Sequence, residues 1–146
     1  MSRSYSPTHY FPPIPVLQVR IYRLGSAMRT DGVEATVDTG ADMTIAPAEL
    51  MEQMEALRVI ETDLVSQWGD LHSVTLYLVD LEIENLLLPG IYIAGDETAS
   101  EIILGRNVLN KLPLFLDGPE QQTELLDDAT VKRLRARQKP TITYEE

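Results

Sequence analysis

Cysteine is absent from this 146-residue chain, and histidine occurs only twice, as His9 and His72. Without a thiol, the chain can form no disulfide framework, no cysteine-based zinc site and no cysteine nucleophile. Two histidines also give poor support to a histidine metal cluster. We therefore predict neither a metal nor a cofactor.

Long apolar runs and an excess of positive charge are missing as well. No apolar stretch approaches the length of a membrane span, and the first residues, rich in Pro and Tyr, lack the apolar core of a signal peptide. Lys and Arg number 12 against 23 Asp and Glu, which gives a formal net charge of -11. This acidic excess is spread through the chain, so it favours solubility and speaks against a nucleic-acid partner. The expected protein is soluble and cytoplasmic, with neither a membrane nor a nucleic acid as partner.

The composition that remains is that of one globular domain. Hydrophobic residues make up 44% of the chain and charged residues 24%, a mixture typical of folded proteins and not of disordered ones. A chain of this length can bury one hydrophobic core of useful size. We therefore expect a single domain.

A short apolar strand runs directly into an acid, a hydroxyl and a glycine at Asp38-Thr39-Gly40. The preceding residues 33–37 alternate between apolar and polar as a half-buried strand does, and Gly40 permits a tight turn that carries Asp38 out of the sheet. Asp followed by Thr and Gly also opens ordinary loops, in which the carboxylate caps its own turn. The pattern therefore indicates a catalytic acid at Asp38, with loop capping as the alternative.

A second stretch, residues 101–112, places two apolar residues before Gly105, Arg106 and Asn107 and continues as a short apolar helix. In this order the two stretches resemble the two hallmarks of the retroviral-type, or retropepsin-like, single-lobe aspartic proteases. The resemblance covers roughly residues 16–118. It implies a mainly β fold, a small closed β-barrel with one or two short helices, in which the two stretches cross beneath the active site.

The resemblance also implies a homodimer. Asp38 is the only Asp that is followed by Thr or Ser and then Gly, and the chain is too short for two lobes of this type, so a second catalytic acid must come from another copy. In the family, water is held between the two Asp carboxylates without a metal or a covalent intermediate. Thr39 would then bond across the interface, and Gly40 would make room for the substrate backbone.

Supporting roles follow from the same resemblance. Ala41 and Asp42 would lie at the edge of the cleft and contact substrate. Arg106 would form an ion pair with Asp42, and Arg106 and Gly105 together would support the site from the second hallmark.

A hairpin is predicted where the family has its flap. Residues 58–66 and 71–78 have the pattern of two strands, and they flank a compact turn. The turn is Gln67-Trp68-Gly69-Asp70. A large apolar ring at a hairpin tip is costly unless it covers something, which favours a substrate-binding flap. The alternative is that the turn is misplaced and Trp68 is a core contact.

The remaining expected elements complete the barrel and its ends. Residues 16–24 should form the first strand, residues 47–57 a short helix beginning at Pro47, and residues 79–84, 86–88 and 90–94 further strands. By the resemblance, residues 112–118 form a terminal strand that pairs between subunits. We expect an extended N-terminal arm over residues 1–15, the protease domain over residues 16–118 and a C-terminal extension over residues 119–146. In that extension, residues 129–139 have the pattern of a basic helix that stops at Pro140.

These observations favour an aspartic endopeptidase that acts as a homodimer on a peptide or protein substrate. A second hypothesis is a catalytically silent protease-fold dimer that binds extended peptides or acts as an assembly module. A third, a small-molecule or metal-binding barrel that uses Asp38 and Asp42, has little support because no further ligand stands at suitable spacing.

Overall fold

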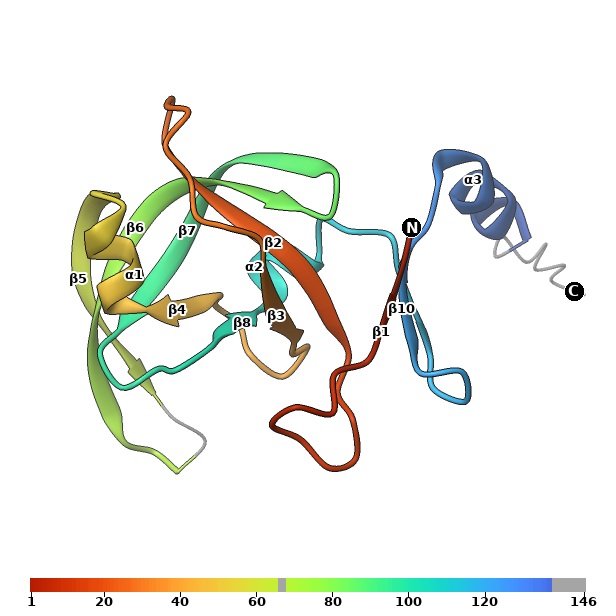
Figure 1. The fold of residues 1–146 in the computed structure, drawn as a ribbon, viewed down its shortest axis with the longest axis horizontal. Helices are drawn as coiled ribbons and strands as arrows, with labels where there is room; N and C mark the ends of the chain where they lie inside the picture. Colours follow the sequence, from red (N-terminus) through yellow and green to blue (C-terminus); the bar gives the residue numbers. More distant parts are fainter. Residues whose placement is uncertain (66–67, 138–146) are drawn as a thin grey trace, which may run out of the picture.

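The structure is a computed structural model that describes residues 1–65 and 68–137. A seven-stranded sheet has the order β2-β3-β8-β4-β7-β6-β5, and β2 also pairs with β6. This last pairing closes six of the strands into a barrel and leaves β5 attached to the outside of β6 (Figure 1). The prediction of a mainly β fold with a small closed barrel and short helices is confirmed. The bounds of the seven strands are β2 Val16–Arg23, β3 Val33–Val37, β4 Ile45–Pro47, β5 Leu57–Val65, β6 Leu71–Ile83, β7 Leu86–Asp96 and β8 Ile102–Leu104.

Alternation along the long strands supplies the core of the barrel. On β2, Leu17, Val19 and Ile21 are buried while the residues between them are partly exposed. β6 repeats the pattern, because every second residue from Val79 to Ile83 is buried. Since successive side chains of a strand point to opposite faces, one face of each strand fills the barrel and the other meets solvent.

Two predicted breaks in the strands are absent. β6 is one strand of 13 residues, and β7 continues through Pro89 and Gly90 as one strand of 11 residues. The register between the two strands shifts between Val79 and Leu81, opposite this Pro-Gly pair. A proline can stand inside a strand at such an irregularity, because the ladder hydrogen bond that it cannot donate is not needed there. The Gly90 amide donates to the Asp80 carboxylate at 3.0 Å. Pro89 and Gly90 therefore mark a bulge and not a strand end.

The first helix is shorter than predicted. α1 spans Ala48–Gln53, with Pro47 at its N-cap, and Glu55 adopts a left-handed conformation with φ of 53°. Leu57 already pairs with Leu78 as the first residue of β5. The apolar spacing indicated a helix to residue 57, but pairing with β6 places Leu57 in a strand, so the helix ends earlier.

The two ends of the chain form a separate three-stranded antiparallel sheet in the order β1-β10-β9. Its strands are β1 Ser2–Ser4, β9 Leu114–Asp117 and β10 Gln122–Leu125. Figure 1 shows this sheet beside the barrel, with α3 (Asp128–Arg137) beyond it. Residues 2–4 of the predicted extended arm are thus part of a sheet, whereas the domain boundaries at residues 15 and 118 stay predictions.

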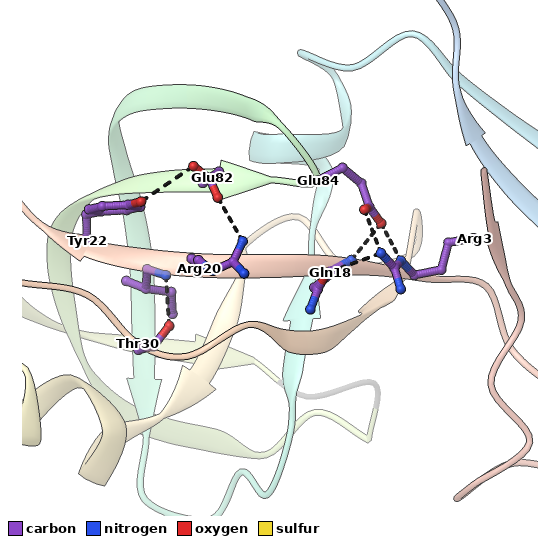
Figure 2. Close-up of polar contacts among 8 residues, drawn as sticks. Arg3, Gln18, Arg20, Tyr22, Thr30, Glu82 and Glu84 are labelled. Carbon is purple, nitrogen blue, oxygen red and sulfur yellow. Dashed lines mark hydrogen bonds and ion pairs between the residues drawn. The ribbon is translucent and has the colours of Figure 1, made fainter. Parts of the chain in front are cut away.

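An ion pair joins the terminal sheet to the barrel. Arg3 contacts Glu84, in the turn between β6 and β7, through Nε at 2.6 Å and Nη2 at 2.8 Å. The same carboxylate accepts the backbone amide of Gln18 at 3.0 Å (Figure 2).

The helix of the C-terminal extension begins as its sequence predicts. The Thr130 amide donates to the Asp127 carboxylate at 2.7 Å, an N-terminal cap. Lys139 and Pro140, the predicted end of this helix, lie outside the described residues. Among the helices that the structure describes, none is long and apolar enough to cross a membrane.

Candidate active site

β3 and β8 lie side by side in parallel and carry Asp38 at their common end. Thr36 pairs with Ile103, and Val37 with Leu104. The Asp38 amide then donates to the Leu104 carbonyl at 3.1 Å, so Asp38 continues the ladder as the chain turns away. Because Ala35 and Val37 are buried in the core, Thr36 and Asp38 occupy the opposite face of β3.

The turn after β3 orients the Asp38 carboxylate. The Gly40 amide donates to Asp38 Oδ1 at 2.9 Å, and the Ala41 amide donates to the Asp38 carbonyl at 3.2 Å. A Cβ atom on Gly40 would lie 3.1 Å from Asp38 Oδ1, a tight contact. Asp38 thus does cap its own turn, but only with one oxygen, because Oδ2 accepts no hydrogen bond from residues 1–65 or 68–137. Asp38 is half-buried, and its Oδ2 remains available for chemistry.

The second hallmark docks on this loop through backbone atoms. α2 spans Arg106–Leu109, and its first two amides, those of Arg106 and Asn107, donate to the carbonyls of Ala41 at 2.8 Å and Asp42 at 3.2 Å. Gly105, just before the helix, packs so closely that a Cβ atom there would lie 2.5 Å from the Met43 carbonyl group. The glycine is therefore required for the loop and the helix to meet.

A polar pair, the buried Thr44 and the half-buried Asn107, holds the two segments together where they cross, and the sequence did not indicate this contact. Asn107 Oδ1 accepts the Thr44 amide at 2.9 Å and the Thr44 hydroxyl at 2.8 Å. The Thr44 hydroxyl in turn accepts the Gly105 amide at 3.1 Å, and Asn107 Nδ2 donates to the Tyr92 carbonyl at 2.9 Å. Thr44 is fully buried. The available signal in the sequence was the polar Thr44 directly before the apolar strand β4.

The predicted ion pair between Arg106 and Asp42 is not formed. Arg106 Nη1 donates instead to the Thr39 carbonyl at 2.8 Å. None of the four ion pairs within the described part of the chain involves Arg106 or Asp42. Asp42 is exposed, and its carbonyl accepts the Asn107 amide, whereas the Arg106 guanidinium lies against the carbonyl of Thr39. Arg106 thus still links the second hallmark to the loop, through a carbonyl oxygen in place of a carboxylate.

The predicted flap hairpin is present as β5, a turn and β6. Trp68 is 82% exposed, so the alternative that it is a core contact is wrong. Gly69, with φ of 82°, provides the left-handed turn residue, and Asp70 precedes β6. Gln67 lies outside the described residues. In Figure 1, the described ends of this hairpin extend on the same side of the barrel as the loop between β3 and β4.

A tyrosine from the N-terminal arm also reaches this end of β3, which the sequence did not indicate. The Tyr10 hydroxyl donates to Glu101 Oε1, immediately before β8. That hydrogen bond, with burial and the Glu101 charge, raises the pKa of Tyr10; the Thr36 side chain acts in the opposite direction, and the charge of Asp38 adds to the rise. Tyr10 therefore keeps its proton and stands within electrostatic range of the candidate catalytic acid.

No cluster suited to a metal ion occurs near these groups or elsewhere in residues 1–65 and 68–137, since no three His, Cys, Asp or Glu side chains come together there. The chemistry that the arrangement itself offers is that of a carboxylate held by a rigid turn.

Comparison with known proteins finds a similarity in structure but none in sequence. No family model and no curated protein matches the sequence. Among solved structures, the chain is similar to EIAV protease complexed with the inhibitor HBY-793, with a TM-score of 0.53 and 17% identity over 71% of this chain and 92% of the other. The likeness shows the fold. The barrel of this chain has a fold similar to that of the EIAV protease, and at this identity the similarity says nothing further about activity.

Proposed function

We propose that the protein is an aspartic endopeptidase whose active site is assembled from two copies of the chain. The observation that carries the proposal is the single Asp38, placed on a glycine turn at the end of β3 with Oδ2 unengaged by the described residues. The protease fold and the docking of the Gly105-Arg106-Asn107 segment behind the loop give further support.

The proposed reaction is direct attack of water on the peptide carbonyl. One Asp38 carboxylate takes a proton from the water, and the other, protonated, first shares its proton with the carbonyl oxygen. The first carboxylate then gives the proton it took from water to the leaving nitrogen, and as the C–N bond breaks a hydroxyl of the tetrahedral intermediate returns a proton to the second, so the pair returns to its starting state. Two adjacent carboxylates suit this division of roles because they cannot both ionise easily.

Neighbouring residues take supporting roles in this proposal. Thr39 bonds between the two loops, Gly40 and Ala41 admit the substrate backbone, and Asp42 contacts substrate at the edge of the cleft. The flap residues Trp68, Gly69 and Asp70, together with Gln67, cover the bound peptide from above.

The terminal sheet offers a surface for the second copy. β9 lies at the edge of that sheet, paired only with β10 among the described strands, and it carries Phe115 and Leu116, both more than 40% exposed. Unpaired strand edges with apolar side chains are templates for pairing with another chain. We propose that the two copies meet at β9, as retropepsin-like proteases pair terminal strands between subunits. In this chain β1 is already paired with β10 of the same copy, so β9 is the strand left for the partner.

The experiment is proteolysis of an unfolded protein at mildly acid pH by the full chain and by Asp38→Asn. An amide has nearly the shape of the carboxylate but cannot act as a base, so cleavage should be lost while fold and association persist. Asp31→Asn is the matched control, because Asp31 is exposed and lacks the following Thr-Gly pair. Cleavage that survives in Asp38→Asn contradicts the proposal. A parent that dimerises and binds peptides without cutting them supports the silent, peptide-binding alternative.

A further inference from the structure

A groove lies next to Asp38, between the N-terminal loop and the barrel. The loop is closed at its base by two backbone hydrogen bonds between Ser6 and Ile14, at 2.9 and 3.0 Å. Its Tyr10 contacts Glu101, and together the loop, the first residues of β3, the start of β8 and α1 line a groove with a volume of about 290 Å³. This volume lies at the lower end of the range for small-ligand sites, about 300 Å³, which suits one side chain of a longer ligand.

The register of β3 and β8 places the groove on the catalytic face. Thr36, which lines it, lies on the same face of β3 as Asp38 and precedes it by two residues, roughly 7 Å along a strand. On β8, Ile102 and Leu104 are buried in the core, so Glu101 and Ile103 share the face of Thr36. A peptide whose backbone passes Asp38 can therefore place a neighbouring side chain in the groove.

The walls of the groove combine apolar surface with negative charge. The lining residues include the apolar Ile14, Val16 and Leu50, the carboxylates of Glu34 and Glu101, and His9, and no Lys or Arg of the described residues lines the groove. Lysine and arginine have the complementary build, because an apolar stem ends in a charged group. A carboxylate side chain would instead meet two like charges.

Glu101 is the better placed of the two carboxylates. The Tyr10 hydroxyl fixes its orientation, and an ionised carboxylate has about four acceptor sites, so it can accept a ligand ammonium in addition to the phenol. Glu34 also interacts with the charge of Arg3, which weakens its pull on a ligand. Tyr10 is thus a positioning residue and Glu101 the contact.

We propose that this groove is a substrate subsite that takes a lysine or arginine side chain adjacent to the bond at Asp38, with Glu101 as the contact for its positive charge. The inference rests on the proposed function, because the groove is defined by its position beside Asp38.

Binding separates this inference from catalysis. Three fluorescein-labelled octapeptides of Ala and Leu carry one central Lys, norleucine or Glu, so the first two share a stem and differ in charge. Their affinities for full-length Asp38→Asn are measured by fluorescence anisotropy, and their cleavage by the parent chain is measured in parallel. We expect Lys to bind about tenfold more tightly than norleucine, a difference of about 1.4 kcal/mol, and Glu to bind most weakly.

Substitutions in the Asp38→Asn background assign the effect to the groove. Glu101→Gln should bring Lys to within about twofold of norleucine while leaving norleucine unchanged, and Glu34→Gln should cause a smaller reduction. Glu120→Gln, which removes an exposed carboxylate in the turn between β9 and β10, should keep the full preference. Unfolding curves confirm that each variant is folded. If Glu101→Gln does not fold, Glu34→Gln provides the test in its place, because Glu34 is exposed.

The outcomes are distinguishable. No preference for Lys, no binding of any peptide, or a preference that survives both substitutions overturns the subsite, even where the parent cuts peptides. A Lys preference that depends on Glu101, without cleavage by the parent, supports the subsite and counts against the proposed catalysis.

Discussion

Replacing Arg3 by Met should expose how much the N-terminal strand is held by one ion pair. Glu84 keeps only 4% of its side chain exposed, and Arg3 supplies two of its hydrogen bonds, at 2.6 and 2.8 Å. Hydrogen bonds to charged groups contribute about 1.5–3 kcal/mol each, and breaking a buried pair from one side costs about 3–5 kcal/mol. Because Arg3 itself is 33% exposed, water replaces part of the loss. We expect a cost of about 3 kcal/mol at neutral pH.

The pH dependence of that cost has a defined sign. Burial raises the pKa of Glu84, but the Arg3 hydrogen bond and charge, with the Gln18 amide, outweigh burial and hold it below the ordinary value of 4.5. In the parent, Glu84 therefore contributes stability that is present above the unfolded pKa and is lost as pH falls through the folded one. In Arg3→Met the Gln18 amide remains but both contributions of Arg3 are lost, so the Glu84 pKa should be higher than in the parent. The penalty of the variant relative to the parent should shrink as pH falls.

Thermal and urea unfolding from neutral pH to pH near 4 measure both effects. A cost of about 3 kcal/mol corresponds to a fall in Tm of roughly 6–12 °C for a chain of this size. Arg20→Met is the matched control, because Arg20 is also 33% exposed but its partner Glu82 is 25% exposed, so the cost should stay below about 1 kcal/mol (Figure 2). Equal costs for the two substitutions, or a penalty for Arg3→Met that grows on acidification, would refute the reasoning.

Two further predictions concern the loop that carries Asp38. Gly105→Ala places a Cβ atom 2.5 Å from the Met43 carbonyl group, so it should cost about 3 kcal/mol or more of unfolding free energy. Gly118→Ala is the control, because no atom lies within 4 Å of the added Cβ and the melting curve should change little. Similar melting curves for the two variants would contradict the close contact at Gly105. In the proposed dimer, two Asp38 carboxylates come together, so association should tighten from neutral to mildly acid pH. Asp38→Asn should dimerise at least as tightly as the parent at neutral pH. Sedimentation measures both, and a folded parent dimer that weakens on acidification excludes the carboxylate pair.

Local signals carried the prediction of the barrel and of the two hallmark segments. The alternation in β2 and β3 and the glycines at 40 and 105 act over a few residues, and the structure places these features as the sequence indicates. Pro89 shows where a local signal misleads. Taken alone, Pro89 indicates the end of a strand, yet β7 continues through it as a bulge opposite Asp80 of β6, and only the pairing with β6 could reveal this.

Contacts between distant segments could not be predicted in the same way. Tyr10 meets Glu101 across 91 positions, and Arg3 meets Glu84 across 81. A side-chain contact of this kind leaves no periodicity in either segment, because each partner is ordinary in its own surroundings. The Arg106 bond to the Thr39 carbonyl was missed for a related reason, since the family resemblance implied Asp42 as the partner and a carbonyl acceptor has no signature in the sequence.

The loop that carries Asp38 owes its shape mainly to backbone atoms and to one polar side-chain pair. Backbone amides or carbonyls of residues 38, 40, 41 and 42 bond to the turn itself, to β8 or to α2, and Thr44 and Asn107 close the crossing behind them. The Asp38 side chain contributes one bond to this framework, the one from the Gly40 amide, and an asparagine side-chain oxygen can accept the same bond. The loop should therefore keep its conformation when the carboxylate is neutralised. A loss of proteolysis in Asp38→Asn can for this reason be assigned to the missing base, whereas a loss in Gly105→Ala would combine displacement of the loop with its chemistry.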